Sequence, residues 1–169
     1  MKIGILGLGV VGSAVYNGFY ELGHDMSYFD PVKEGSKFGD VLGSDICFIC
    51  VPTPPNSEGF CDTSIVEESI NKLNESKYKG IAVIKSTVTP GTTQKLADSY
   101  PDLNIAFVPE FLRERCAEID FVENHDVCII GAHDDGAYEA IKLSHGKFPE
   151  KFVRFSSEYR MTPASKSFH

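Results

Sequence analysis

Short apolar runs alternate with longer amphipathic stretches along the chain. The runs KIGILG, DMSYFD, DICFICV, GIAVIKS, LNIAFV, DVCIIG and KFVRF predict strands buried on both faces. The stretches between them predict helices over residues 10–22, 64–73, 92–99 and 136–144. Strands that alternate with helices are joined by right-handed crossovers, so the fold class is α/β, with a doubly wound, mostly parallel sheet. The pattern does not give the strand order.

Glycine and proline mark the predicted boundaries. Gly23 ends the first helix, Pro31 follows the second strand, and Pro90 and Gly91 precede the helix that opens at Thr92. The third strand runs into VPTPPNSEGFCDTS, a proline-stiffened loop. Open α/β sheets bind ligands at the carboxyl ends of their strands, which makes this loop a candidate site element.

Length and charge narrow the class of protein. The chain has 169 residues, enough for one buried domain, which we place at 1–155. The segment 156–169 reads as the start of a further helix. A formal net charge of −8 argues against nucleic-acid or anionic-membrane partners. No apolar run approaches the ~20 residues of a membrane helix, so the expected compartment is the cytoplasm.

The five cysteines are Cys47, Cys50, Cys61, Cys116 and Cys128. An odd number, with two inside apolar runs, fits reduced, buried thiols better than a disulfide framework. The pair in CFIC has the spacing of a metal or redox motif, but on a strand positions three apart face opposite sides. We therefore expect structural cysteines and predict no metal site.

The strongest motif is GLGVVG, which directly follows the first strand and opens the first helix. Gly7 permits the tight turn, Gly9 lets the backbone approach a pyrophosphate, and Gly12 allows the helix to pack closely on the sheet. The amides of Val10 and Val11 at the helix N-terminus would hold the phosphates without a basic patch. This context predicts a Rossmann-type dinucleotide site.

Asp30 ends the second strand, about 20 residues beyond the glycine motif. An acid there accepts hydrogen bonds from the adenosine ribose and disfavours a 2′-phosphate, so the predicted cofactor is NAD. Alternatively, Asp30 only initiates the turn at DPVKEG. The nearby Lys33 and Lys37 keep NADP open as the cofactor.

Three later segments, CVPTPPNSEGFCDTSIVEESI, VIKSTVTPGTT and FVPEFLRERCAEID, resemble in order and spacing the UDP-glucose/GDP-mannose 6-dehydrogenase family. The chain departs from the family pattern at Val10, Val108 and Arg115, where the family often has an aromatic residue, asparagine and glycine. The resemblance implies oxidation of the C6 hydroxymethyl group of a nucleotide-sugar to a carboxylate by two NAD, through a cysteine-bound intermediate.

The resemblance also implies roles for single residues. Glu110 is expected to be the catalytic carboxylate, or alternatively a solvated acid in a loop. Thr87 is expected to position a water close to the cofactor, or alternatively only to close a strand as a β-branched residue. Thr53 is expected to face the cofactor. Glu114 is a second acid that is expected to position the cofactor or the substrate. The nucleotide-sugar is expected to contact the segment formed by Phe111, Leu112 and Arg113. Lys166 is expected to stabilise negative charge on the sugar oxygen, or is simply an exposed lysine.

The family's nucleophilic cysteine lies in a substrate domain beyond residue 169, so we expect a truncated cofactor portion that is inactive alone. The alternative is a non-catalytic NAD-binding module or a decayed dehydrogenase. A different β-hydroxyacid-type dehydrogenase is disfavoured by STVTPGTT and PEFLRE. The sugar, the nucleotide base and the oligomeric state, including a homo-oligomer, stay open.

Overall fold

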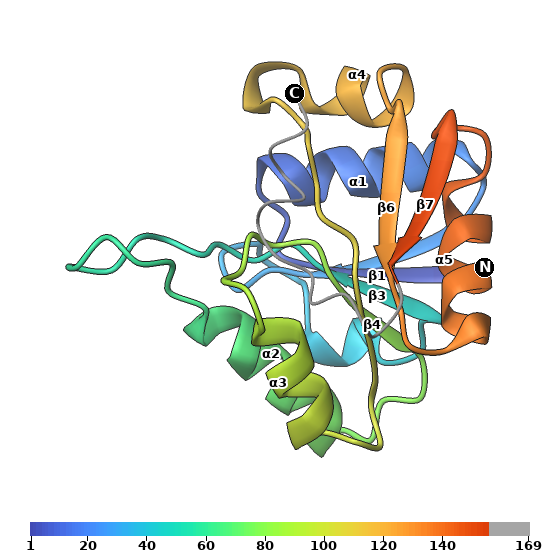
Figure 1. Cartoon of the computed structure of the whole chain (residues 1–169). Coiled ribbons are helices and arrows are strands. Elements are labelled where there is room, and N and C mark those ends of the chain that lie inside the picture. The colour runs from blue at the N-terminus through green and yellow to red at the C-terminus, as the bar shows by residue number, and fades with distance from the viewer. Residues whose placement is uncertain (156–169) are drawn as a thin grey trace.

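A computed structural model describes residues 1–155 and contains one seven-stranded sheet (Figure 1). The strands lie in the order β2-β1-β3-β4-β5-β6-β7. Their bounds are β1 (Lys2–Leu6), β2 (Asp25–Phe29), β3 (Ile46–Ile49), β4 (Ile81–Ile84), β5 (Asn104–Phe107), β6 (Val127–Gly131) and β7 (Lys151–Phe155). The predicted α/β sheet and all seven predicted strands are confirmed.

Strands β1 to β5 are parallel, and β6 pairs antiparallel with β5 through the single partnership of Phe107 with Gly131. Strand β7 is parallel to β6. The prediction that every strand is buried on both faces is wrong for β2 and β7, whose residues are half-buried or exposed. These two strands form the edges of the sheet, so each has a neighbouring strand on one side only.

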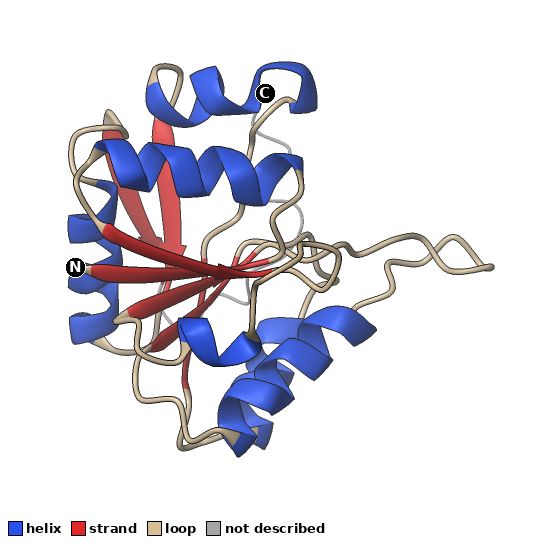
Figure 2. Ribbon diagram, turned by 180° about the vertical axis from the view of Figure 1, so that it is seen from behind, coloured by secondary structure: helices blue, strands red, loops and turns tan. Residues whose placement is uncertain are grey.

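Helices cover both faces of the sheet (Figure 2). One face carries α1 (Val10–Glu21), α4 (Ala117–Val122) and α5 (Asp135–His145), which share a core with Ile5, Phe48 and Val83. The other carries η1 (Phe38–Val41), α2 (Ser64–Glu75) and α3 (Thr92–Ser99), packed on Ile49 and Ile84. The predicted helices are confirmed, whereas the short η1, α4 and η2 (Glu114–Cys116) were not predicted.

The first helix shows why the sequence packs as it does. Val15 and Phe19 are buried, one turn apart, and face the sheet. Gly18, on the α4 side, leaves room for the ring of Phe121, which a Cβ atom there would strike. The chain leaves α1 at Gly23, whose positive φ of 84° suits a residue without a side chain.

The order of the strands places a ligand crevice. From β1 the chain crosses to β2 on one side and then returns to β3 on the other, so the carboxyl ends of β1 and β3 flank a topological switch point. The loop between β3 and α2 projects from this edge of the sheet (Figures 1 and 2). Of the predicted site residues that the structure describes, Gly7, Asp30 and Thr53 follow β1, β2 and β3 at this edge.

Candidate cofactor and catalytic site

The glycine loop between β1 and α1 has little room for side chains. Gly7 adopts a φ of +88°, and a Cβ atom on it would lie 2.9 Å from the carbonyl oxygen of Cys50. A Cβ atom on Gly12 would overlap the carbonyl oxygen of Gly7. These two glycines are required by the fold itself, because any larger residue meets backbone.

Gly9 differs, because a Cβ atom there would meet no protein atom within 4 Å. Its φ of −76° is also available to every residue. Gly9 is the N-cap of α1, no side chain caps this end, and the first turn carries no acidic residue. The open space and the uncapped amides of Val10 and Val11 fit an anion placed against the backbone, as a pyrophosphate would be.

Asp30 is tied to this loop by its carboxylate. Oδ2 accepts a hydrogen bond from the amide of Leu8 at 2.7 Å, and Oδ1 accepts one from the amide of Val32 at 3.0 Å. The bond from the amide of Val32 shows that Asp30 does begin the turn at DPVKEG, which was the alternative to a ribose contact. Each carboxylate oxygen has a second lone pair, so the ribose role stays a prediction.

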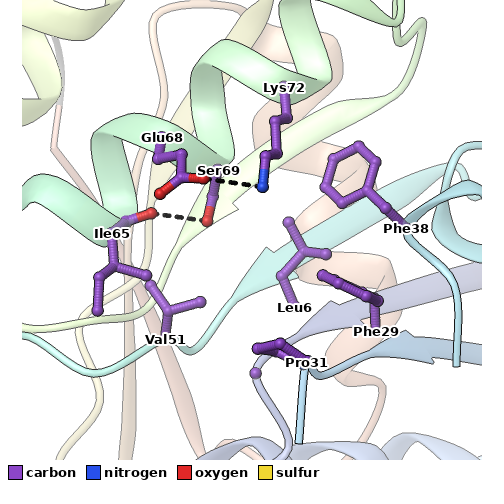
Figure 3. Close-up of a pocket in the computed structure, with 10 residues that line it drawn as sticks. Leu6, Phe29, Pro31, Phe38, Val51, Ile65, Glu68, Ser69 and Lys72 are labelled. Carbon is purple, nitrogen blue, oxygen red and sulfur yellow. Dashed lines mark hydrogen bonds and ion pairs between the residues drawn. The ribbon is translucent and has the colours of Figure 1, made fainter. Parts of the chain in front are cut away.

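A pocket of about 230 Å³ opens beside Gly7 at the ends of β1 and β2 (Figure 3). Its apolar wall is formed by Leu6, Phe29, Pro31, Phe38, Val51 and Ile65. On α2 it meets an ion pair between Lys72 and Glu68, with Nζ 2.8 Å from Oε1. A flat aromatic base next to Asp30 and the glycine loop matches the shape and chemistry of such a pocket.

Sequence reasoning did not identify this pocket. Its walls come from β1, β2, η1, the end of β3 and α2, so no local run of residues signals it. Phe38 shows the difficulty best. In the sequence it is an isolated aromatic residue in a polar connection, and only the folded chain sets it edge-on to Phe29, with ring centroids 5.7 Å apart.

Thr53 and Thr87 come from two loops that meet. The thiol of Cys61 donates to the carbonyl oxygen of Thr87 at 3.3 Å and, more weakly, to that of Thr53 at 3.9 Å. Cys61 thus ties the projecting loop after β3 to the loop after β4. Thr87 itself is exposed and Thr53 half-buried. The structure brings these two predicted residues into one neighbourhood.

Glu110 lies beyond the end of β5 and is half-buried. Its Oε2 accepts a hydrogen bond from the amide of Leu112 at 3.1 Å, which holds the carboxylate in its loop. Leu112 packs against the core shared with α1, while Phe111 is half-buried. Glu114 begins η2 and is exposed.

Arg113 has a structural partner. Its Nε and Nη2 donate to the carboxylate of Asp120 at 2.9 and 2.7 Å, and its backbone amide donates to the same group at 2.9 Å. These hydrogen bonds hold the pKa of the Asp120 carboxyl well below its usual range. The arrangement fixes the segment that follows Glu110, and the expected substrate contact of Arg113 stays a prediction. Lys166 lies outside the described residues.

The two cysteines of CFIC face opposite sides of the sheet, as their spacing on a strand predicts. Cys47 is buried in the core shared with α2, whereas Cys50 packs against the core shared with α1, so the two thiols lie on opposite faces. Burial raises the pKa of Cys50 to about 12 and that of Cys128 to about 11. Within residues 1–155 no cluster of His, Cys, Asp or Glu could hold a metal ion, and no helix could span a membrane.

The fold and the open helix N-terminus define a dinucleotide-binding domain of Rossmann type. The model of the NAD-binding domain of the UDP-glucose/GDP-mannose dehydrogenase family matches residues 33–148. The chain therefore belongs to this family, and its cofactor is NAD.

Named relatives agree with this assignment. UDP-glucose 6-dehydrogenase AglM of Haloferax volcanii is 28% identical over 189 residues, covering 83% of this chain and 43% of that protein. A GDP-mannose dehydrogenase structure from Pseudomonas aeruginosa, 25% identical, has a TM-score of 0.76 over 94% of this chain and 47% of its own. The structure of a UDP-glucose dehydrogenase from Pyrobaculum islandicum, 25% identical, has a TM-score of 0.79 and covers 92% of this chain and 46% of its own. The chain spans less than half the length of these relatives.

Proposed function

We propose that this chain is the cofactor-binding portion of an enzyme that oxidises the C6 hydroxymethyl group of a nucleotide-sugar. One observation carries the proposal: the uncapped N-terminus of α1 and the half-buried carboxylate of Glu110 belong to the same edge of the sheet. A dehydrogenase of this kind needs an anion site for the cofactor and a base beside the carbon that loses hydride. Both are supplied by loops at strand carboxyl ends.

The geometry of the glycine loop supports the proposed cofactor roles. The amides of Val10 and Val11 would hold the pyrophosphate above Gly9, and Asp30 would accept from the ribose. The apolar pocket beside Phe29 would take the adenine. NAD, when bound, accepts the hydride; the protein's contribution is to fix its position and to exclude water.

Glu110 would accept the proton of the C6 hydroxyl, and Thr87 would orient a water for hydrolysis. Phe111, Leu112 and Arg113 would line the sugar site, with Glu114 near the cofactor and Lys166 stabilising negative charge on the sugar oxygen. Burial keeps Cys47, Cys50 and Cys128 protonated, which makes them poor nucleophiles. We therefore expect the chain to bind NAD but to turn over very little nucleotide-sugar alone.

Calorimetric titration with NAD and NADP, followed by UDP-glucose and GDP-mannose in the presence of NAD, tests the proposal. NADH formation is then measured at high protein concentration, with Glu110→Gln as the catalytic variant and Glu58→Gln, in the projecting loop, as its control. We expect NAD binding in all three proteins. Any slow NADH formation should be lost only in Glu110→Gln.

Absence of NAD binding would refute the cofactor role. Formation of two NADH per sugar by this chain would refute the expectation that the nucleophile comes from elsewhere. It would direct attention to Cys61, in the loop after β3, or to Cys116, at the end of η2.

A further inference from the structure

The pocket beside the glycine loop has two chemically different sides. Most of its apolar wall comes from the strands, from the segments that follow them and from η1, whereas its polar side chains all come from α2. These are Glu68, Ser69 and Lys72, which share one face of the helix because residues three and four positions apart are neighbours there. Figure 3 shows them across the pocket from Phe29 and Pro31. A flat base held between the apolar groups would turn one polar edge toward α2.

The hydroxyl group of Ser69 is available to a ligand only as an acceptor. Its Oγ donates its one proton to the carbonyl oxygen of Ile65, one helical turn earlier, at 2.8 Å. The exposed fraction of Ser69 is 9%, so water has little access to the remaining lone pairs. A hydroxyl whose proton is used in this way accepts further hydrogen bonds but cannot donate one. Ser69 therefore favours a ligand N–H group and disfavours a ligand carbonyl oxygen at the same place.

Lys72 supplies the opposite kind of group. Its Nζ lies 2.8 Å from Oε1 of Glu68, and this ion pair holds the long side chain beside the pocket (Figure 3). An ammonium group has three N–H donors, so two remain for a ligand acceptor. Ser69 and Lys72 thus present an acceptor next to a donor, three positions apart on one helix.

Adenine carries the complementary pair of groups on one edge. Its 6-amino group donates hydrogen bonds, and the neighbouring ring nitrogen N7 accepts one. Hypoxanthine and guanine have a carbonyl oxygen in place of that amino group, and this oxygen would face the lone pairs of Ser69. An apolar pocket discriminates poorly between bases of similar shape, whereas a buried hydrogen-bonding group discriminates well.

We propose that Ser69 and Lys72 select the adenine base of the cofactor, with Oγ of Ser69 accepting from the 6-amino group and Nζ of Lys72 donating to N7. The site then prefers a dinucleotide with a 6-amino purine to one with a 6-oxo purine. Glu68 contributes by holding Lys72 in place. This inference rests on the proposed placement of the adenine in this pocket.

The test compares NAD with nicotinamide hypoxanthine dinucleotide, in which a carbonyl oxygen replaces the 6-amino group. Both are titrated calorimetrically into the unsubstituted chain, Ser69→Ala and Lys72→Met. Ser99→Ala is the control for the serine, because the Ser99 hydroxyl donates to the carbonyl oxygen of Lys95 at the same 2.8 Å but lies on α3, outside the pocket. Lys95→Met is the control for the lysine, because Lys95 also forms an ion pair with a glutamate of α2.

In the unsubstituted chain, we expect NAD to bind at least about tenfold more tightly than the hypoxanthine dinucleotide, which loses one hydrogen bond and sets two buried acceptors against each other. In Ser69→Ala this ratio should fall to within about threefold, with the loss of affinity confined to NAD. Lys72→Met should weaken NAD binding by about fivefold or more. The two control variants should change neither Kd by more than about twofold.

Ser69→Ala should stay folded, because alanine is a better helix former than serine, and thermal unfolding checks this. An unchanged affinity ratio in Ser69→Ala would overturn the proposal, as would equal affinity of the unsubstituted chain for both dinucleotides. Unchanged NAD binding in Lys72→Met would refute the contact assigned to Lys72. All three results leave NAD as the cofactor. Failure of the unsubstituted chain to bind either dinucleotide would instead refute the cofactor site and this inference together.

Discussion

Substitutions at Gly9 and Gly12 should distinguish an effect on NAD binding from an effect on the stability of the fold. A side chain at Gly9 extends into open space at an ordinary φ, so Gly9→Val should change the free energy of unfolding by no more than about 0.5 kcal/mol. A side chain at Gly12 overlaps the backbone of Gly7, so Gly12→Ala should cost about 3 kcal/mol or more, because backbone must move.

Because the fold tolerates a side chain at Gly9, the effect of Gly9→Val on NAD binding can be measured without a loss of stability. If the pyrophosphate lies against Gly9, a valine side chain pushes it away from the amides of Val10 and Val11. Loss of two hydrogen bonds to a charged group corresponds to about 3 kcal/mol, or more than 100-fold in Kd. Gly9→Val should therefore bind NAD at least about 100-fold more weakly while its thermal unfolding is unchanged.

The assay combines calorimetry, NADH fluorescence and thermal unfolding. The chain contains no tryptophan, so little protein fluorescence overlaps the NADH signal. Gly43→Val is the matched control, because Gly43 also has open space around its Cβ position and no positive φ, but lies at the opposite end of β3 from the glycine loop. A Gly9→Val protein that binds NAD as tightly as the parent would refute the pyrophosphate assignment. A destabilised but fully binding Gly9→Val would refute the geometry as well.

Three further predictions concern charged and titratable groups. Asp30→Ala should lower the free energy of unfolding by about 1–3 kcal/mol, because two backbone amides lose their acceptor, and should narrow the preference for NAD over NADP; an unchanged Kd ratio in titrations would contradict the ribose role. Arg113→Met should lose stability at pH 5–7 in denaturant unfolding. The depressed pKa of Asp120 contributes stability above the ordinary carboxyl pKa near 4 that is lost as pH falls, so parent and variant should converge in strong acid. For His125, whose pKa in the folded chain is about 4, the unfolded chain binds more protons than the folded chain between pH 6.5 and 4. The free energy of unfolding should therefore decrease as the pH is lowered through this range, by at most about 1.4 kcal/mol per pH unit. His125→Asn should flatten that slope.

The amino-acid sequence determined much of the fold. Local patterns suffice for a strand such as β3, because four apolar residues in a row cannot stay in water, and for α1, because Val15 and Phe19 recur with helical spacing. The conformations of Gly7 and Gly12 also follow from one short motif, since the turn and the helix packing involve neighbouring residues.

Tertiary structure alone decided the features that join distant segments. The apolar pocket needs Phe29, Phe38 and Ile65 from three elements, and the burial of Lys85 brings its Nζ over the ring of Phe121 from α4. The half-exposed state of β2 and β7 depends on strand order, which no periodicity encodes. Hydrophobic periodicity reports which face of an element is buried, whereas the partner that buries it is selected by the packing of the whole chain.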